Sequence, residues 1–527
     1  PVYAVRWVKP PRAGTAPAQA PAYEVVPVGA PAPAAGVTVV VARHAGHAEA
    51  ARECWVFLDM LRRWAEEGAA ARVVLVLPQA ATGGLLAGAA KAAALEHPEF
   101  QITRVYAGES DRAKGGAAAE DLEGRAAAAA AAAARFPQER DLWLRAAGVL
   151  VPRLVPFAPA APEEVVMPAS RADVAGGTGM ALSMNRYVVT GATGGLGREV
   201  LRWLVEVQLI APEQIVVVAR RPLELEWPVQ VVVADITDES SLLNSPELQA
   251  VGKVVGIFHL AGVLEDATLA SLTEEKLQKV LGPKSAAALN LLSVARQLDW
   301  GTDWMLAFSS TSSLLGYPGQ SNYCAGNGVL DSLAAFGGEE GIRVVAVNWG
   351  PWAEVGMARK GTKAHEVALR DADRPLPTAV ALRSLAAIIQ TMQEEPVVSC
   401  QFAVADVAWD QSAYWGDSPL LDLIRRGSGP SSSSVSEAGD ASDPGAAPGA
   451  APGRGLGAVA QFFAEAVDLP WGKLASSSLA TAGLDSLDIV SLRNQFSKRF
   501  RPAPLSLFTK PNVTFAELDA ALGAYGG

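Results

Sequence analysis

The chain has 527 residues, of which half are hydrophobic and 19% are charged, and its formal net charge is −11. This length exceeds what one hydrophobic core organises, so we expect two to four domains, and the composition excludes a mostly disordered protein. The acidic balance argues against nucleic acid as the main partner.

The first part of the chain, residues 1–183, mixes strand and helix patterns. Strand patterns cover residues 2–7, 37–41, 73–77 and 148–151. A helical pattern covers 48–67, and the nine consecutive alanines at 126–134 predict a second helix of high intrinsic propensity. The run Thr82-Gly83-Gly84 follows a predicted strand but lacks the spacing of a nucleotide-binding turn, so we expect an ordinary loop there. Residues 167–183 are predicted to be weakly structured.

The second part, residues 184–426, is more regular. Apolar strand patterns cover residues 187–190, 215–219, 229–234, 254–260, 304–308, 343–349 and 397–402. They alternate with segments of helical length, which predicts a parallel sheet covered by helices on both faces. The expected fold is therefore a doubly wound, Rossmann-like α/β domain.

A glycine-rich turn stands between the first strand of this array and a predicted helix over 198–207. Its sequence is Thr190-Gly191-Ala192-Thr193-Gly194-Gly195-Leu196-Gly197. Such glycines permit a tight turn and allow backbone N–H groups to approach a pyrophosphate at the start of a helix. A glycine triplet alone is often an ordinary turn. Its position between strand and helix favours a nucleotide-binding loop.

Residues after the following strands suggest which nucleotide binds. Arg220 and Arg221 stand where an NAD site has an acidic residue, and they suit a 2′-phosphate, so NADPH is favoured over NADH; the alternative is a solvated basic strand end. Asp235, with Ile236 beside it, is placed to receive the adenine amino group. Small residues after the fourth strand, Ala261-Gly262, offer a shelf for the cofactor.

Three polar residues follow in a pattern that suggests proton transfer. Ser310 closes a predicted strand, and Tyr323 and Asn327 are four residues apart, so they project from one helix face. Each residue alone is commonly ordinary. Placed after a nucleotide loop, the set resembles the short-chain dehydrogenase/reductase superfamily.

Longer motifs narrow the resemblance to the ketoreductase domain of a modular type I polyketide synthase. They are Phe308-Ser309-Ser310, Pro318-Gly319-Gln320-Ser321-Asn322-Tyr323, Asn348-Trp349-Gly350-Pro351-Trp352, His259-Leu260-Ala261-Gly262-Val263-Leu264 and Pro283-Lys284. The resemblance implies that NADPH reduces a β-keto carbonyl bound by Ser310 and Tyr323, and that Tyr323 supplies the proton with help from Lys284 and Asn327. Residues 1–183 resemble the structural half of the same ketoreductase.

The resemblance also carries a stereochemical expectation. B-type ketoreductases have a Leu-Asp-Asp triplet where this chain has Leu264-Glu265-Asp266, and Pro318 and Asn322 fit that type. The other type has a tryptophan where Leu315 stands. The expected product has a D-configured β-hydroxyl, although Glu265 departs from the pattern.

The C-terminal part begins with a Ser-, Gly- and Pro-rich stretch over 427–455, which predicts a flexible linker. The module at 456–527 has helical patterns over 457–467 and 488–500. Its Gly483-Leu484-Asp485-Ser486-Leu487 run resembles the attachment site of acyl carrier proteins, which implies 4′-phosphopantetheine on Ser486; the alternative is a helix-capping serine. With seven basic and six acidic residues after position 453, this module is nearly neutral, so docking is expected to depend on apolar contact or tethering.

Together these features predict an NADPH-dependent reductase of a carrier-bound β-ketoacyl thioester in polyketide biosynthesis. The implied partners are the chain's own carrier, ketosynthase and acyltransferase domains, and a phosphopantetheinyl transferase. A fatty-acid synthase segment and a non-catalytic scaffold that presents the carrier are the alternatives. We expect no metal, nucleic acid or membrane partner.

The remaining expectations concern the cellular setting. The three cysteines form neither a disulfide framework nor a metal-ligand spacing, which favours a reducing compartment. No signal peptide and no apolar run of membrane-spanning length is visible. The chain begins with Pro1 and so reads as a piece of a longer polypeptide, with a cytoplasmic location expected, or an organellar lumen if a targeting segment precedes it.

Overall fold

A computed structural model gives the arrangement of most of the chain. It describes residues 2–10, 23–33, 37–42, 46–107, 120–145, 148–157, 185–336, 341–357, 359, 373–392, 400–409, 412, 418–427, 457–467, 469–484, 486–500, 503, 505–508, 510 and 512–523. The chain divides into two compact units, Pro1–Leu421 and Asp422–Gly527. The weakly structured passage predicted at 167–183 and, apart from Gly427, the linker predicted at 427–455 lie outside the described residues.

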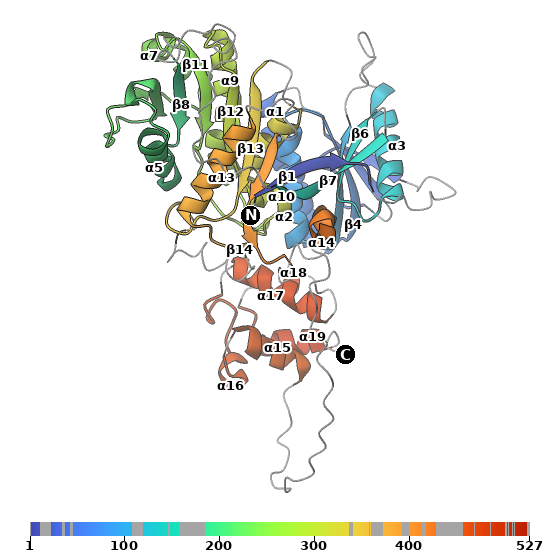
Figure 1. Cartoon of the computed structure of the whole chain (residues 1–527). Coiled ribbons are helices and arrows are strands. Elements are labelled where there is room, and N and C mark those ends of the chain that lie inside the picture. Colours follow the sequence, from blue (N-terminus) through green and yellow to red (C-terminus); the bar gives the residue numbers. More distant parts are fainter. Residues whose placement is uncertain are drawn as a thin grey trace. The chain divides into compact units, whose positions relative to one another are not determined.

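One sheet of fourteen strands runs through the described part of the first unit (Figure 1). Its strands are β1 (Val2–Val8), β2 (Tyr23–Val26), β3 (Val37–Val41), β4 (Ala71–Leu77), β5 (Phe100–Ala107), β6 (Asp141–Arg145), β7 (Gly148–Phe157), β8 (Arg186–Thr190), β9 (Ile215–Ala219), β10 (Gln230–Val233), β11 (Val254–His259), β12 (Trp304–Ser310), β13 (Arg343–Trp349) and β15 (Gln401–Val404). Their order is β10-β9-β8-β11-β12-β13-β15-β1-β7-β6-β5-β4-β3-β2.

The two halves of this sheet are parallel, and they meet at two antiparallel strands. Strands β10 to β15 pair in parallel, as do β2 to β6, whereas β1 pairs antiparallel with both β15 and β7. The predicted Rossmann-like α/β class is therefore confirmed. The joining of both halves into one sheet was not predicted, because it depends on the N-terminal strand reaching β15 across the sequence. A separate two-stranded sheet pairs β14 (Asp373–Arg374) with β16 (Asp406–Val407).

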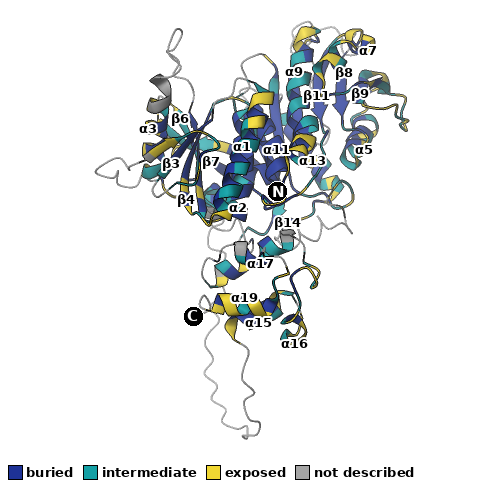
Figure 2. Ribbon diagram, turned by 180° about the vertical axis from the view of Figure 1, so that it is seen from behind, coloured by how far each residue is buried: buried dark blue, intermediate teal, exposed yellow. Residues whose placement is uncertain are grey.

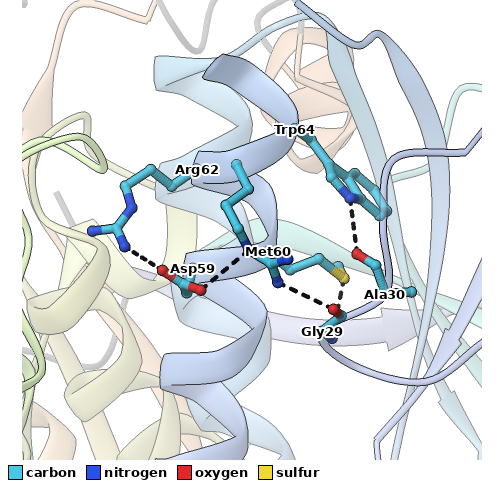
Figure 3. A network of polar contacts seen from close by, with 7 residues as sticks. Gly29, Ala30, Asp59, Met60, Arg62 and Trp64 are labelled. Carbon is cyan, nitrogen blue, oxygen red and sulfur yellow. Dashed lines mark hydrogen bonds and ion pairs between the residues drawn. The ribbon is translucent and has the colours of Figure 1, made fainter. Parts of the chain in front are cut away.

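Helices α1 (His47–Glu66), α2 (Gly83–Glu96) and α3 (Glu120–Arg135) belong to the first half. Contacts with the turn after β2 hold α1 in place: the Trp64 indole N–H donates to the Ala30 carbonyl at 3.1 Å, and the Gly29 N–H donates to the Met60 sulfur at 3.3 Å (Figure 3). The loop expected at Gly83-Gly84 is wrong, because both glycines lie in the first turn of α2. The spacing of these glycines bears only on nucleotide binding. In the structure, Gly84 allows α2 to pack closely against α11 (Ser321–Phe336).

Helices of the second half cover both faces of the parallel strands. They are α5 (Gly195–Arg202), the π-helical turn η2 (Trp203–Val207), the short η3 (Pro212–Gln214), α6 (Glu239–Leu243), α7 (Pro246–Gln249), α8 (Glu274–Leu281), the π-helical turn η4 (Gly282–Ala286), α9 (Ala287–Gln297), α10 (Thr311–Leu315), α11 (Ser321–Phe336) and α13 (Thr378–Thr391). The final turn of this unit is η6 (Pro419–Leu421). Figure 2 shows the strands and α11 mostly in dark blue, so α11 lies inside the unit.

The second unit is helical in its described part. Its helices are α14 (Asp422–Gly427), α15 (Ala458–Val467), α16 (Trp471–Leu474), α17 (Ser486–Arg499), α18 (Leu505–Phe508) and α19 (Phe515–Leu522). Buried phenylalanines from α15, α17 and α19 (Phe463, Phe496 and Phe515) form the centre of its core. No described helix of the chain is long and apolar enough to cross a membrane. Among the described residues, no cluster of three or more histidine, cysteine or acidic side chains is placed to hold a metal ion.

Candidate active site

The glycine-rich turn connects β8 to α5, beside β11, at the point where the strand order reverses. Gly191 has a φ of +76°, and a Cβ there would lie 2.6 Å from the backbone nitrogen of Ala261. A Cβ on Gly195 would lie 2.7 Å from the nitrogen of Gly356, and one on Gly197 would lie 2.3 Å from the oxygen of Gly191. Helix α5 begins at Gly195 without a side-chain cap. The turn is therefore closely packed against neighbouring backbone, and it lies at the switch point where doubly wound sheets usually bind ligands.

The other residues of the turn divide between the core and the surface. Thr190 is fully buried, whereas Thr193 and Gly194 are exposed. Leu196 packs against the apolar core, and a Cβ on Gly356 would lie 2.4 Å from its Cδ1. The segment after β13 thus lies against the glycine turn, a contact that the sequence analysis did not anticipate.

The residues predicted to bind the adenosine half lie at the ends of β9 and β10. Arg220 and Arg221 are exposed. One carboxylate oxygen of Asp235 accepts hydrogen bonds from the Thr237 backbone N–H at 2.9 Å and from the Thr237 hydroxyl at 2.8 Å. Ile236 is buried. The contacts with Thr237 fix the loop at Asp235.

Ser310 and Tyr323 come from neighbouring elements and are both buried. Ser310 ends β12 and caps α10, because its hydroxyl accepts the Ser312 N–H at 3.2 Å. Tyr323 lies in the first turn of α11 and is 8% exposed. Burial raises the pKa of Tyr323 to about 12, and interactions with Asn327 and Ser310 oppose this increase. The phenol is therefore protonated throughout the neutral range.

Lys284 lies in the η4 turn, and its ammonium group lies near the Tyr323 ring. Its ammonium nitrogen donates to the Phe308 carbonyl at 2.6 Å and lies 5.9 Å from the centre of the Tyr323 ring. A Cβ on Gly262 would lie 2.4 Å from Cε of Lys284, so Gly262 leaves the space that the lysine stem needs. Burial lowers the pKa of Lys284 to about 8, and the negative charge of Asp331 partly offsets this.

Asn327 lies one helical turn after Tyr323 and is fully buried. Its amide N–H donates to the Tyr323 carbonyl at 2.9 Å, while its side-chain oxygen has no hydrogen-bond partner among the described residues. A buried, unpartnered acceptor normally has a water molecule or ligand group as its partner. Asn327 therefore offers a hydrogen-bond acceptor to the site.

His259 joins the glycine turn to the Lys284 turn, and the sequence analysis gave it no role. Its Nδ1 lies 2.9 Å from the Thr190 hydroxyl, and its Nε2 lies 2.9 Å from the Lys284 carbonyl oxygen. Burial, with a smaller contribution from the Lys284 charge, lowers the pKa of His259 to about 4. The ring is thus neutral and bridges the two elements. The one sequence signal for His259 is its position at the start of the motif that runs from His259 to Leu264.

The residues predicted to control stereochemistry lie after β11 and around the start of α11, and hydrogen bonds join the two segments. Gln320 donates to Asp266 at 3.2 Å and accepts from the Ser312 hydroxyl at 2.9 Å, and Ser312 in turn contacts Ser310 at 3.1 Å. A chain of hydrogen bonds therefore runs from Ser310 to Asp266. The Asn322 amide donates to the Glu265 carbonyl at 2.7 Å.

The last two predicted stereocontrol residues, Leu264 and Pro318, lie on the same two segments. Leu264 is half-buried, and Pro318 is buried. The structure thus brings together the loop after β11 and the loop before α11.

Behind Ser310 lies a second polar network that the sequence analysis missed. The half-buried carboxylate of Asp331 on α11 accepts from the Ser309 and Ser313 hydroxyls, each at 2.7 Å, and from the Asn348 amide at 2.9 Å. Asn348 also donates to the Ser310 carbonyl at 3.0 Å. This network fixes the backbone that carries Ser310.

The amino-acid sequence is similar to that of known proteins. Residues 185–354 match the KR domain family. A phenolphthiocerol/phthiocerol polyketide synthase from Mycobacterium tuberculosis is 29% identical over 375 residues, covering 64% of this chain and 19% of that protein. Polyketide synthase GfsA of Streptomyces halstedii is 34% identical over 289 residues, covering 52% of this chain and 4% of that protein. The chain thus spans a fifth or less of these relatives.

Solved structures share the fold of the first unit. A ketoreductase from the first module of phoslactomycin biosynthesis in a Streptomyces species has a TM-score of 0.60 at 23% identity, with 80% of this chain and 97% of that chain covered. An A-type ketoreductase structure from a modular polyketide synthase has a TM-score of 0.58 at 24% identity, with 74% and 82% covered. At this identity the likeness establishes the fold.

Proposed function

Over residues 185–354 the chain belongs to the ketoreductase family of modular polyketide synthases, and we propose that it reduces a β-ketoacyl thioester with NADPH. The observation that carries this proposal is the convergence of Ser310, Tyr323 and Lys284 beside the glycine turn. The substrate is a thioester on a phosphopantetheine arm. Ketosynthase and acyltransferase domains are the proposed sources of that acyl chain.

The glycine turn suits a dinucleotide. Gly191 and Gly195 allow its backbone to pack against the backbone at Ala261 and Gly356, and the uncapped N-terminus of α5 suits a pyrophosphate. The exposed Arg220 and Arg221 are placed for a 2′-phosphate. When bound, NADPH supplies the hydride that reduces the ketone.

The chain's own residues manage the charge that develops on the ketone oxygen. Ser310 and Tyr323 donate hydrogen bonds to that oxygen, and Tyr323 transfers its proton to it. A phenol with a pKa of about 12 is a weak acid. The ammonium of Lys284 stabilises the resulting phenolate, and the free acceptor of Asn327 holds a water through which the proton is replaced.

The pKa of Lys284 predicts the alkaline side of the pH profile. Because this pKa is about 8, Lys284 loses its proton as the pH rises through that value, and kcat/KM for reduction should fall. Tyr323 remains protonated over the same range, since its pKa is about 12. The measurement is kcat/KM between about pH 6 and pH 10. In Lys284→Arg, which stays charged, the rate should be lower throughout but without this decline; an unchanged alkaline limb would assign it to another group.

The proposed product configuration rests on the motif resemblance of Leu264, Asp266, Pro318 and Asn322 to B-type ketoreductases. Hydrogen bonds join the loop that carries Asp266 to the start of α11, where Tyr323 lies. We therefore propose a D-configured β-hydroxyl.

The second unit is proposed as the acyl carrier. Helix α17 begins at Ser486, so a phosphate attached there meets the N-terminal end of a helix, which favours anions. A phosphopantetheinyl transferase is the implied partner for this attachment. Because 456–527 is nearly neutral, tethering supplies the effective concentration that charge attraction would otherwise provide.

The proposed function is tested on the whole chain. A phosphopantetheinyl transferase and acetoacetyl-CoA load the carrier, and NADPH or NADH is then added. We expect rapid oxidation of NADPH, slower oxidation of NADH, and a D-hydroxyacyl product by chiral analysis after release. Lack of NADPH oxidation would overturn the reductase, whereas a mainly L-hydroxy product would overturn only the stereochemical assignment.

A further inference from the structure

Helix α2 of the first half lies directly against α11, the helix that carries Tyr323. A Cβ on Gly84 would lie 2.0 Å from the carbonyl oxygen of Gly328, and one on Gly88 would lie 2.0 Å from that of Cys324. Since a single methyl group would collide with backbone atoms at both positions, the two helices are in direct backbone contact. The first half therefore has a fixed register against the candidate active site.

Glu96, the last residue of α2, projects its carboxylate into the second half. One oxygen accepts the Gly319 backbone N–H at 2.8 Å, and the other accepts the Leu269 backbone N–H at 2.7 Å. Glu96 is fully buried. Charge-assisted hydrogen bonds to two backbone donors compensate for the loss of water around a buried carboxylate.

The two loops that Glu96 joins are those that carry the predicted stereocontrol residues Asp266 and Pro318. The Ala267 N–H donates to the Gly319 carbonyl at 2.9 Å, and Gln320 donates to Asp266 at 3.2 Å. Gly319 also lies two residues before the helix that carries Tyr323. The distance between the stereocontrol loop and the proton donor therefore depends on contacts at Gly319.

We propose that Glu96 is a positioning residue for the reductase, which sets the spacing between the Asp266 loop and Tyr323 and thereby the face of the ketone that is reduced. This inference rests on the proposed function. It assigns to the first half a part in substrate orientation, in addition to support of the sheet. One carboxylate holds both loops, so its loss frees both at once.

The test is Glu96→Gln in the full holo-protein. An amide of the same size has one acceptor oxygen and turns an NH2 group toward the other backbone donor, so one of the two contacts is lost. We expect a fall in kcat of about tenfold to a hundredfold, because small displacements of reacting groups have effects of this size. The minor hydroxyl epimer should increase, while the Kd for NADPH stays unchanged. The control is Glu66→Gln, which removes an exposed carboxylate from α1.

Amide hydrogen exchange tests the two Glu96 contacts, with the Leu269 and Gly319 amides, without relying on catalysis. In the wild-type protein the Leu269 and Gly319 amides should exchange slowly, and in Glu96→Gln they should exchange faster, unlike in Glu66→Gln. Rapid exchange of both amides in the wild type would overturn the proposal, even if the variant failed to fold. So would a folded Glu96→Gln protein with unchanged kcat and product configuration. A wild-type chain that oxidises no NADPH would instead contradict the proposed function. The exchange rates of the Leu269 and Gly319 amides would still test whether Glu96 holds both loops.

Discussion

Tyr323→Phe is expected to slow reduction of the carrier-bound ketone by at least about a hundredfold. The variant removes the group that is proposed to transfer the proton, and general acid catalysis of this kind accounts for about 3 to 5 kcal/mol of transition-state stabilisation. The fold should tolerate the change, because phenylalanine retains the ring and its volume. NADPH consumption in a single turnover on the loaded carrier measures the effect.

Tyr3→Phe provides the matched control for this variant. Tyr3 on β1 is as buried as Tyr323, at 8% exposed, and its hydroxyl accepts only a long hydrogen bond from Trp409 at 3.4 Å among the interactions described. We expect its rate to equal that of the wild type. A Tyr323→Phe rate within about threefold of the wild type would show that another group or water supplies the proton.

The sequence predicts best those parts of the fold that depend on a pattern within one short segment. The strands at β8, β9 and β11 are continuous apolar runs, and a buried parallel strand requires such a run. The glycine turn directly follows the end of β8, and Ser310 is the last residue of β12. Their meeting at one edge of the sheet is a consequence of parallel pairing, so the candidate site could be located from spacing alone.

What could not be predicted depends on contact between the two halves. Glu96 and Lys91 lie more than 170 residues from the backbone groups they contact, at Leu269, Gly319 and Ser313. Neither stands in a motif, and lysine and glutamate side chains usually lie on exposed surfaces. Gly84 gave a misleading signal for a related reason: glycine in a helix looks unfavourable until the close approach of α11 explains it.

His259 and Asp331 represent an intermediate case. His259 stands in a motif that the sequence analysis quoted, yet its bridging position between Thr190 and Lys284 requires the fold. Asp331 lies on the same helix as Tyr323, and helical spacing alone does not place it against Ser309 and Ser313 of another strand and helix. Spacing thus points to the residues that are proposed to act on the substrate, whereas the residues that support them are found only from the packing of the fold.

Ser486→Ala is expected to abolish phosphopantetheine attachment completely. The serine hydroxyl is the nucleophile that forms the phosphodiester bond in the proposed attachment, and alanine has no substitute for it. Incubation with a phosphopantetheinyl transferase and coenzyme A should add the mass of one phosphopantetheinyl group to the wild-type chain and none to the variant. Reduction of a free thioester by the first unit should persist, because the change leaves Ser310, Tyr323 and Lys284 intact.

Ser491→Ala separates attachment chemistry from damage to the helix. Ser491 lies on the same helix, α17, and its hydroxyl only accepts a hydrogen bond from Gln495 at 3.2 Å among the described contacts. This control should be loaded at the wild-type rate. If Ser486→Ala were still loaded, the carrier assignment of this serine would be wrong. If the wild type also failed to load while its reductase activity remained, the helical unit would be a module without a carrier function, and the reductase proposal would stand independently.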